Sequence, residues 1–130
     1  MANEEKQLLL KDLCARLPYG VIVDPVDCGK AILIGIKDEG LLLFDTICKE
    51  EYDKPWNIEY IKPYLRPMSS MTEEEKKEYK DLLYCVKYAV DTVYAVNMLT
   101  DWLNAHHFDW RGLINKGLAL EAPEGMYKED

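Results

Sequence analysis

The stretch AILIGIKDEGLLLFDTI, residues 31–47, decides the fold. It consists of two short apolar runs separated by Asp38, Glu39 and Gly40. A three-residue loop with glycine available for the left-handed position is typical of a β-hairpin. Gly35, inside the first run, indicates a bulge or bend in that strand. The stretch therefore predicts two paired antiparallel strands.

Sequence on either side extends this hairpin into a sheet. Residues 19–24 (YGVIVD) read as an earlier strand, and a turn centred on Cys28 and Gly29 connects it to the hairpin. The segment after the hairpin contains several prolines, which interrupt regular secondary structure. We expect a short strand over 57–60 there and a 3₁₀-like turn over 61–65. The pattern predicts a small, curled antiparallel sheet, with an SH3-like barrel as one possible form by analogy.

Helices are expected on both sides of the sheet in sequence. Residues 4–17 carry apolar side chains at helical spacing and end before Pro18. A second helical pattern covers 73–106, opened by a capping box at Thr72. Because one helix of that length would be too long for a compact domain of this size, we expect a break.

The break is expected within 86–92, which the sequence leaves open as strand, loop or helix. Asp91 or Thr92 would then cap a helix that ends near His107. Altogether the sequence predicts an α+β single domain over 1–130. It would have an N-terminal helix, a curled sheet and C-terminal helices packed on it, with residues 1–5 and 124–130 frayed.

Composition restricts the partners. The chain has 130 residues and a formal net charge of −8, which disfavours general nucleic-acid binding. No apolar run approaches the length of a membrane span, and no signal peptide is visible at the start. The four cysteines, Cys14, Cys28, Cys48 and Cys85, lack metal-binding or redox spacing. We expect a cytoplasmic protein with reduced, mostly buried cysteines, without membrane association, a metal or a cofactor.

One candidate site lies in DWLNAHHFDWRGLINKGLALEAPEGMY, residues 101–127. His107, Asp109 and Arg111 have the side-chain types that acid–base catalysis or anion binding requires. Structural roles are the favoured interpretation: Asp109 caps the following turn and Arg111 pairs with an acidic residue. Trp102 is expected in the core, and His106 and His107, adjacent at a helix end, suit the helix dipole better than a metal ion.

A second candidate site is aromatic. Tyr52, Trp56, Tyr60 and Tyr64 follow the predicted hairpin among prolines. Such rings can line an exposed groove that binds a peptide or a planar ligand. The alternative, which we favour, is that they cover one end of the sheet.

Three blocks also carry a family resemblance: LCARLPYGV (13–21), IKPYLRPMSSMTEEEKKEY (61–79) and the 101–127 stretch. They resemble a family of short uncharacterised proteins of gut Bacteroidetes and of their phages and mobile elements. The blocks cover somewhat under half of the chain. The resemblance implies a bacterial or phage cytosolic setting and an accessory role, and it assigns no activity, cofactor or catalytic residue to any position.

We therefore expect a non-enzymatic binding or interaction module with a protein partner, and a homo-oligomer is possible. A specific form of this hypothesis is an acidic decoy for the basic site of a nucleic-acid-binding protein, which requires carboxylates concentrated on one face. The alternative is a small ligand-binding protein or enzyme using His107, Asp109 and Arg111, which requires those side chains to converge on a cleft.

Overall fold

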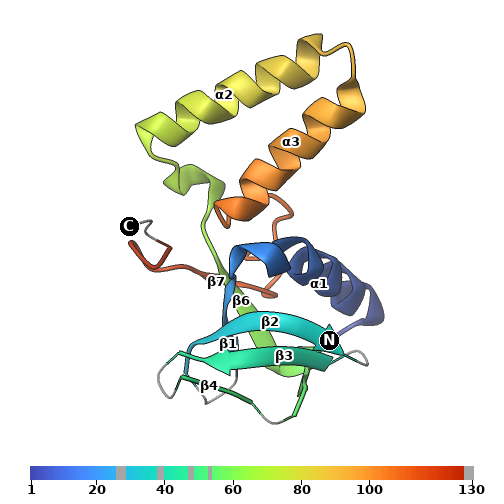
Figure 1. Ribbon diagram of the computed structural model, residues 1–130, viewed down its shortest axis with the longest axis vertical. Coiled ribbons are helices and arrows are strands. Elements are labelled where there is room, and N and C mark those ends of the chain that lie inside the picture. Colours follow the sequence, from blue (N-terminus) through green and yellow to red (C-terminus); the bar gives the residue numbers. More distant parts are fainter. Residues whose placement is uncertain (26–28, 38–39, 47–48, 53, 128–130) are drawn as a thin grey trace.

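The computed structural model describes residues 1–25, 29–37, 40–46, 49–52 and 54–127. It has a body of one helix and a sheet, from which two further helices project as a hairpin (Figure 1). The α-helices are α1 (Asn3–Arg16), α2 (Glu73–Tyr88) and α3 (Thr92–Ala105). The strands are β1 (Ile22–Pro25), β2 (Ala31–Lys37), β3 (Gly40–Asp45), β4 (Glu50–Glu51), β5 (Trp56–Asn57), β6 (Ile61–Leu65) and β7 (Leu120–Glu121). The α+β class predicted from the sequence is confirmed.

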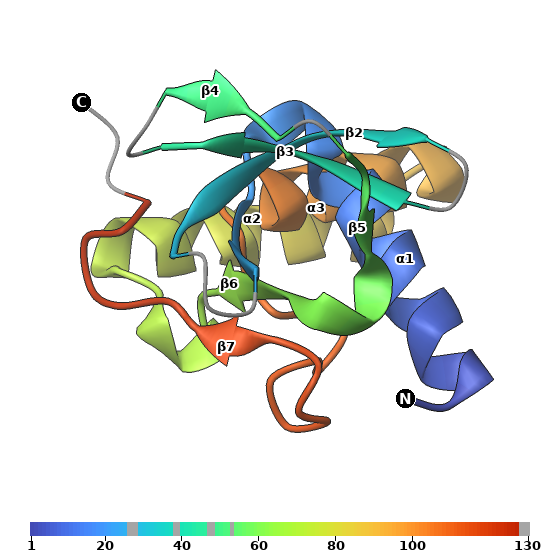
Figure 2. The same ribbon diagram turned by 90° about the horizontal axis from the view of Figure 1, so that it is seen from below.

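The sheet is curled but open. Its strand order is β4-β3-β2-β1-β6-β7, and β5 pairs with β3 outside this path. All pairs are antiparallel except β6 with β7, so the sheet is mixed. The end strands of this order, β4 and β7, do not pair with each other, so the described sheet does not close into a barrel (Figure 2). The β2–β3 hairpin forms as predicted, with a register shift between Leu33 and Gly35 that confirms the expected bulge. The loop at Asp38 and Glu39 and the turn at Cys28 lie outside the described residues.

One core joins α1 to the sheet. Leu9 and Leu13 of α1 pack in a single buried cluster with inward-facing residues of the strands, among them Val23, Leu33 and Leu43. The alternation of buried and half-buried residues in β1 and β3 matches the two-residue period of a strand with one face on a core. The helix that covers the sheet is therefore α1.

The hairpin of α2 and α3 begins as the sequence predicts. Thr72 Oγ1 accepts a hydrogen bond from the Glu75 amide, and the Glu75 carboxylate accepts one from the Thr72 amide, which completes the capping box. The break lies at 89–91, and Asp91 caps α3 by accepting from the Tyr94 amide. Helix α2 runs on to Tyr88, so 86–88 is helical and the strand alternative is excluded.

A second buried cluster fixes the base of the hairpin. Met71, Leu103 and Phe108 are buried there, with half-buried Trp102 packed against them. Trp102 is thus a partly buried member of a small cluster at the hairpin base, and its indole N–H donates to Glu78 across the hairpin. This cluster determines where the hairpin leaves the body.

Helix α3 ends in a Schellman motif. The Phe108 amide donates to the Leu103 carbonyl and the His107 amide donates to the Asn104 carbonyl. The motif requires a left-handed residue at His107, whose φ is 61°. Glycine is the usual residue in this position, so a histidine here needs interactions of its own to offset the strain.

Two local predictions are wrong. The segment 57–65 has the reverse order of elements: a 3₁₀ turn covers Ile58–Tyr60 and a strand covers Ile61–Leu65. Asn57 accepts a hydrogen bond from the Glu59 amide and so starts the turn, while β6 gains a strand partner on each side. At the expected frayed ends, α1 begins at Asn3 and Tyr127 makes hydrogen bonds, while residues 128–130 lie outside the described residues. None of the described helices is long and apolar enough to cross a membrane.

Candidate functional site

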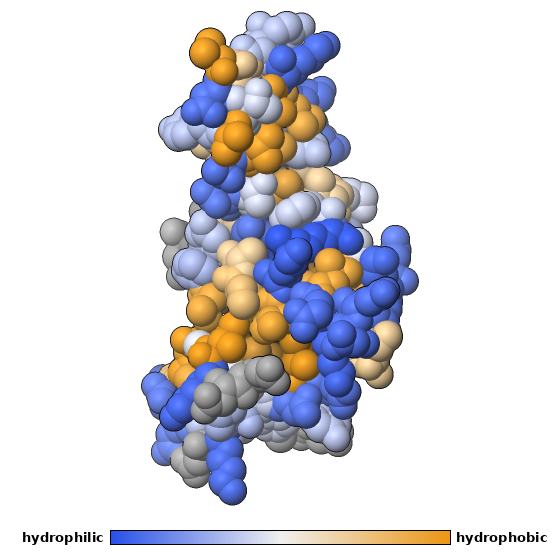
Figure 3. Space-filling model, turned by 90° about the vertical axis from the view of Figure 1, so that its right-hand side faces the viewer, coloured by the Kyte–Doolittle hydropathy of each residue, from blue (hydrophilic) through white to orange (hydrophobic). Residues whose placement is uncertain are grey.

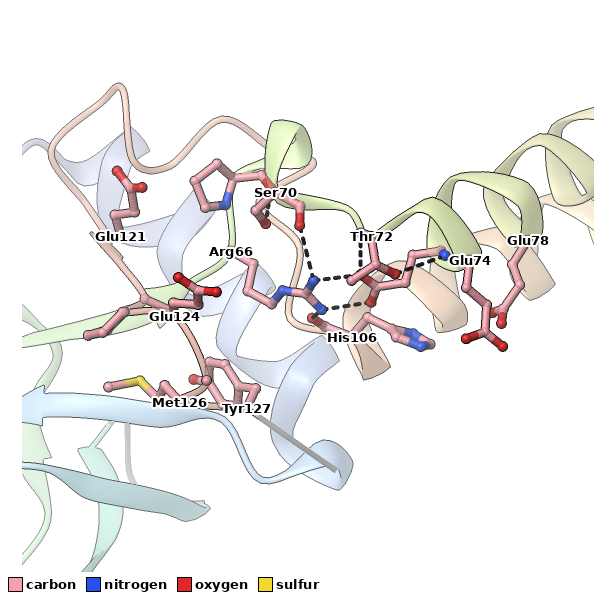
Figure 4. A pocket seen from close by; sticks show the side chains of 15 residues that line it. Arg66, Ser70, Thr72, Glu74, Glu78, His106, Glu121, Glu124, Met126 and Tyr127 are labelled. Carbon is pink, nitrogen blue, oxygen red and sulfur yellow. Dashed lines mark hydrogen bonds and ion pairs between the residues drawn. The ribbon is translucent and has the colours of Figure 1, made fainter. Parts of the chain in front are cut away.

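A cleft of about 880 Å³ lies where the hairpin meets the body. One wall is the start of α2 with the turn before it, and the other is the C-terminal segment from Glu121 to Tyr127 (Figure 4). Arg66 and His106 lie between the two walls. The cleft therefore joins segments that are far apart in the sequence.

Arg66 holds the hairpin side of the cleft in place. Its guanidinium makes a two-pronged ion pair with Glu75, with N–O distances of 2.7 and 2.8 Å. It also lies over the Phe108 ring, 4.2 Å from the centroid, and contacts the Ser70 carbonyl. The hydrogen bonds from Arg66, assisted by those from Thr72, lower the pKa of Glu75 to about 2. The positive charge of Arg66 is thus matched by one specific carboxylate.

Further carboxylates line the two walls. Glu74 and Glu78, one helical turn apart, lie on the α2 side, while Glu121 and Glu124 lie on the C-terminal segment (Figure 4). Glu78 accepts the Trp102 indole N–H at 2.8 Å. Within the described part of the chain, none of these four glutamates has an ion-pair partner. The cleft consequently has excess negative charge and suits cationic ligands.

Tyr127 fixes the C-terminal wall to the sheet. Its hydroxyl accepts a hydrogen bond from the Ile22 amide at 2.8 Å and lies 2.7 Å from the Tyr64 carbonyl, to which it donates. Its ring stacks on His107, with 3.7 Å between centroids. Burial raises the pKa of the Tyr127 hydroxyl, so it remains a neutral donor.

His107 is buried beneath this wall. Only 6% of its surface is exposed, and its Nδ1 has no hydrogen-bond partner among the described residues. Burial, aided by the nearby Arg16 charge, lowers its pKa to about 4. At neutral pH the ring is therefore uncharged.

The other two members of the predicted catalytic cluster have separate partners. Both Asp109 carboxylate oxygens accept backbone amides, from Leu113 at 2.7 Å and Ile114 at 3.0 Å, which is the capping role expected from the sequence. Arg111 pairs with Asp12 of α1 at 2.8 Å. His107, Asp109 and Arg111 thus have different contacts in three places, and none of them lines the cleft.

Asp12 is the centre of a buried ion-pair network. It is fully buried, as is Arg16, which donates to it at 2.8 Å and also to the Phe108 carbonyl at 2.6 Å. With Arg111 on its other oxygen, Asp12 links α1 to the C-terminal region. This network is structural, because it lies inside the body and joins elements 99 and 92 residues apart.

The four aromatic candidates lie in three different places. Tyr52 and Trp56 pack edge to face, 5.4 Å apart, and lie half-buried against the main core. Tyr60 is 54% exposed in the 3₁₀ turn. Tyr64 lies in β6 and Lys30 is 6.0 Å from its ring. Tyr52 and Trp56 thus pack on the main core, and none of the four rings lines the cleft at the hairpin base.

Cys14 and Cys85 are free and exposed, which corrects the prediction that they are buried. Cys28 and Cys48 lie outside the described residues. Among the residues that the structure describes, no group of three or more His, Cys, Asp or Glu side chains is placed to hold a metal ion.

Sequence reasoning did not single out the carboxylates of the cleft. In the sequence, Glu74 lies only near the start of an expected helix, and Glu124 lies in an expected frayed end. The sequence feature that could have indicated the cleft is the spacing of Glu74 and Glu78 on one helix face, together with the two glutamates near Pro123. That signal becomes specific only once the C-terminal segment is known to return to the start of α2.

Comparisons with models of protein families, with curated proteins and with solved structures find no match. The interpretation of the cleft therefore rests on its own geometry and charge.

Proposed function

We propose that this chain is a non-enzymatic interaction module that binds a basic polypeptide segment in the acidic cleft, within a bacterial or phage accessory system. The observation that carries the proposal is the placement of Glu74 and Glu78 on one wall and Glu121 and Glu124 on the other. An extended segment lying between the walls would meet carboxylates on both sides. Lysine and arginine side chains are the natural complement of such a site.

The neighbouring Arg66 does not oppose this binding. Its charge is already matched by Glu75, whose low pKa keeps the ion pair intact across the physiological range. The remaining glutamates are then free to attract a cation. A chain of net charge −8 also steers a basic partner from a distance, which accelerates association at low salt.

The acidic-decoy hypothesis fits the same cleft. A protein that binds nucleic acid presents lysine and arginine side chains at phosphate spacing, and carboxylates can occupy those side chains instead. The gathering of glutamates at one cleft supports this form of the proposal. The enzyme alternative has less support, because His107, Asp109 and Arg111 are each engaged in separate structural contacts.

Fluorescence anisotropy with a labelled, lysine- and arginine-rich peptide tests the proposal. The test variant is Glu74→Gln/Glu121→Gln/Glu124→Gln, which leaves Glu78 bound to Trp102. The matched control is Glu4→Gln/Glu50→Gln/Glu51→Gln, at exposed positions outside the cleft. Both variants remove three negative charges, so long-range attraction weakens equally in both.

We expect wild-type protein to bind with an affinity that falls as salt rises, since exposed charges are screened beyond a Debye length of about 8 Å at physiological ionic strength. The cleft variant should bind at least tenfold more weakly than the control variant, which corresponds to about 1.4 kcal/mol. Equal affinities of the two variants would show that the peptide responds only to total charge, and the cleft would not be the site.

A further inference from the structure

His106 lies in the cleft, between the glutamates of α2 and those of the C-terminal segment (Figure 4). It is the residue at which α3 ends. Its ring is half-buried and packs on the Trp102 ring, with 4.4 Å between the two centroids. The side chain is therefore held in place where a bound segment would pass.

The Trp102 carbonyl determines which nitrogen of the His106 ring carries the hydrogen. Nδ1 lies 2.8 Å from that carbonyl oxygen, which can only accept a hydrogen bond. Nδ1 is therefore the donor. In the neutral ring the other nitrogen, Nε2, then has a lone pair and is an acceptor. Among the described residues, no donor is hydrogen-bonded to Nε2.

Two carboxylates lie beside this ring. Glu78 accepts the Trp102 indole N–H through one oxygen, at 2.8 Å, so it adjoins the ring on which His106 packs. Its second oxygen has no hydrogen-bond partner within the described chain. Glu74 precedes Glu78 by one helical turn, and both side chains lie on the same side of the cleft as the His106 ring (Figure 4). Acceptors from two helices thus face one part of the cleft.

Acceptors that are spread in this way suit a guanidinium better than an ammonium. The Cβ atoms of residues one turn apart on a helix are about 5–6 Å apart, and His106 comes from the neighbouring helix. A lysine ammonium has its three N–H bonds on a single nitrogen, whereas an arginine guanidinium has five N–H donors spread over a planar fork. A guanidinium can therefore donate to a carboxylate and to a ring nitrogen at the same time.

Arg66 shows that this end of α2 accommodates a guanidinium. It makes the two-pronged ion pair with Glu75 and lies over the Phe108 ring. The Phe108 ring stacks with those of Trp102 and His106. Because Glu75 matches the charge of Arg66, a second guanidinium beside it would meet carboxylates rather than an unpaired cation.

We infer that His106 gives the cleft a preference for arginine over lysine in the bound segment. Its Nε2 accepts a hydrogen bond from the guanidinium, while Glu78 or Glu74 pairs with the positive charge. This inference rests on the proposed function, because it names the side chain that the acidic cleft receives. Carboxylates alone would attract either cation through its charge, so the ring acceptor is the specificity-determining group.

Two labelled peptides test the inference by fluorescence anisotropy. One consists of arginine, glycine and serine, and the other is identical except that lysine replaces every arginine, so their charges are equal. Both lack apolar residues, because apolar side chains are exposed over the hairpin and the body (Figure 3). The measurements are made at about pH 8, since only a neutral imidazole can accept a hydrogen bond.

Two substitutions separate the acceptor from the rest of the ring. Asparagine places an amide N–H near the position of Nδ1 and has no atom at Nε2. His106→Asn therefore retains a donor to the Trp102 carbonyl and loses the acceptor. Glutamine is long enough to place its amide oxygen near Nε2, so His106→Gln should restore part of the preference.

We expect wild-type protein to bind the arginine peptide about tenfold more tightly than the lysine peptide, because a hydrogen bond to a charged group contributes about that much affinity. In His106→Asn the two affinities should lie within about threefold of each other. The variant Glu4→Gln/Glu50→Gln/Glu51→Gln, which changes only positions outside the cleft, should keep the full preference.

The failures are distinguishable. If Glu74→Gln/Glu121→Gln/Glu124→Gln weakens binding of both peptides but wild-type protein binds them equally, the acidic cleft stands and the inference is overturned. A full arginine preference in His106→Asn would also overturn it, because the preference would then come from the carboxylates. If the cleft variant and its control outside the cleft bind both peptides equally, the proposed function fails and the inference fails with it.

Discussion

Protonation of His107 should govern how the stability of this protein depends on pH between 6.5 and 4. The ring is 6% exposed, stacks on Tyr127, and has its pKa lowered from 6.5 to about 4 by burial and by the Arg16 charge. In the unfolded chain His107 takes up a proton below pH 6.5, whereas in the folded chain it does so only near pH 4. The free energy of unfolding therefore falls as pH falls through this window.

The difference of about 2.5 pKa units corresponds to at most about 3 kcal/mol, at 1.36 kcal/mol for each unit. This stability is fully present above pH 6.5 and is lost by pH 4. Glu75 affects stability in a different pH range. Because its pKa is about 2 in the folded chain, the stability that it contributes is lost between pH 4.5 and 2. Measurements from pH 7.5 to 4.5 thus report mainly on His107.

The informative variant is His107→Asn. Asparagine tolerates the left-handed backbone at this position, so the Schellman motif should be retained while the titrating ring is removed. Loss of the Tyr127 stack lowers stability by an amount that does not depend on pH. Urea unfolding followed by circular dichroism at each pH would give the two stability curves, with His106→Asn as the control that removes the other histidine.

The wild-type curve should fall more steeply with decreasing pH than the His107→Asn curve, and the two should approach each other near pH 4.5. Parallel curves for these two proteins would refute the reasoning, because they would mean that His107 binds its proton equally well in the folded and unfolded chains.

Two further variants test the contacts that join the C-terminal region to the body. Asp12→Ala should destabilise the fold by about 3–5 kcal/mol, because it leaves the fully buried Arg16 unpaired. In urea unfolding, the double variant Asp12→Leu/Arg16→Met should recover most of the lost stability. A loss below about 1 kcal/mol in Asp12→Ala would contradict the structural role of this ion pair. Tyr127→Phe should cost about 1–3 kcal/mol and speed hydrogen exchange at the Ile22 amide, which loses its acceptor. Tyr60→Phe, at an exposed ring, should change neither quantity, and an unchanged Ile22 exchange rate in Tyr127→Phe would show that the hydroxyl does not hold this wall.

The sequence predicted the local elements better than their assembly. Hydrophobic periodicity locates α1, and the two apolar runs joined by the loop at Gly40 locate the β2–β3 hairpin, because both signals depend only on neighbouring residues. The Thr72 capping box and the Asp91 cap were equally readable, since a cap is completed within three residues. Segments without such local signals, such as 57–65, were assigned in the wrong order.

Long-range pairing was not readable in the same way. Nothing near Leu120 indicates that it pairs in parallel with Tyr64, and this pairing adds β7 to the edge of the sheet and places the C-terminal segment beside the hairpin. The projection of α2 and α3 was missed for a related reason. Their apolar pattern resembles that of helices packed on a sheet, but only the lower half of that pattern finds a partner in the body.

The density of polar and aromatic residues in 101–127 has a structural explanation. This stretch contacts α1, the sheet and the hairpin base, and its side chains are used at those contacts: Arg111 binds Asp12, Tyr127 binds Ile22, and Asp109 caps its own turn. A short chain closing its fold needs such specific contacts over 99 and 105 residues of separation. Residues with catalytic side-chain types are thereby occupied in holding the protein together.

The surfaces left for binding are made by residues that look ordinary in the sequence. Glutamates are common at the start of a helix, where they interact favourably with the helix dipole, and single tyrosines are common on the exposed face of a helix. In the proposed function, Glu74 and Glu78 gain a binding role from position alone, because the return of the C-terminal segment makes them one side of the cleft. The proposed peptide binding therefore depends on the same long-range contacts that the sequence could not predict, so a variant that loosens Tyr127 should weaken it.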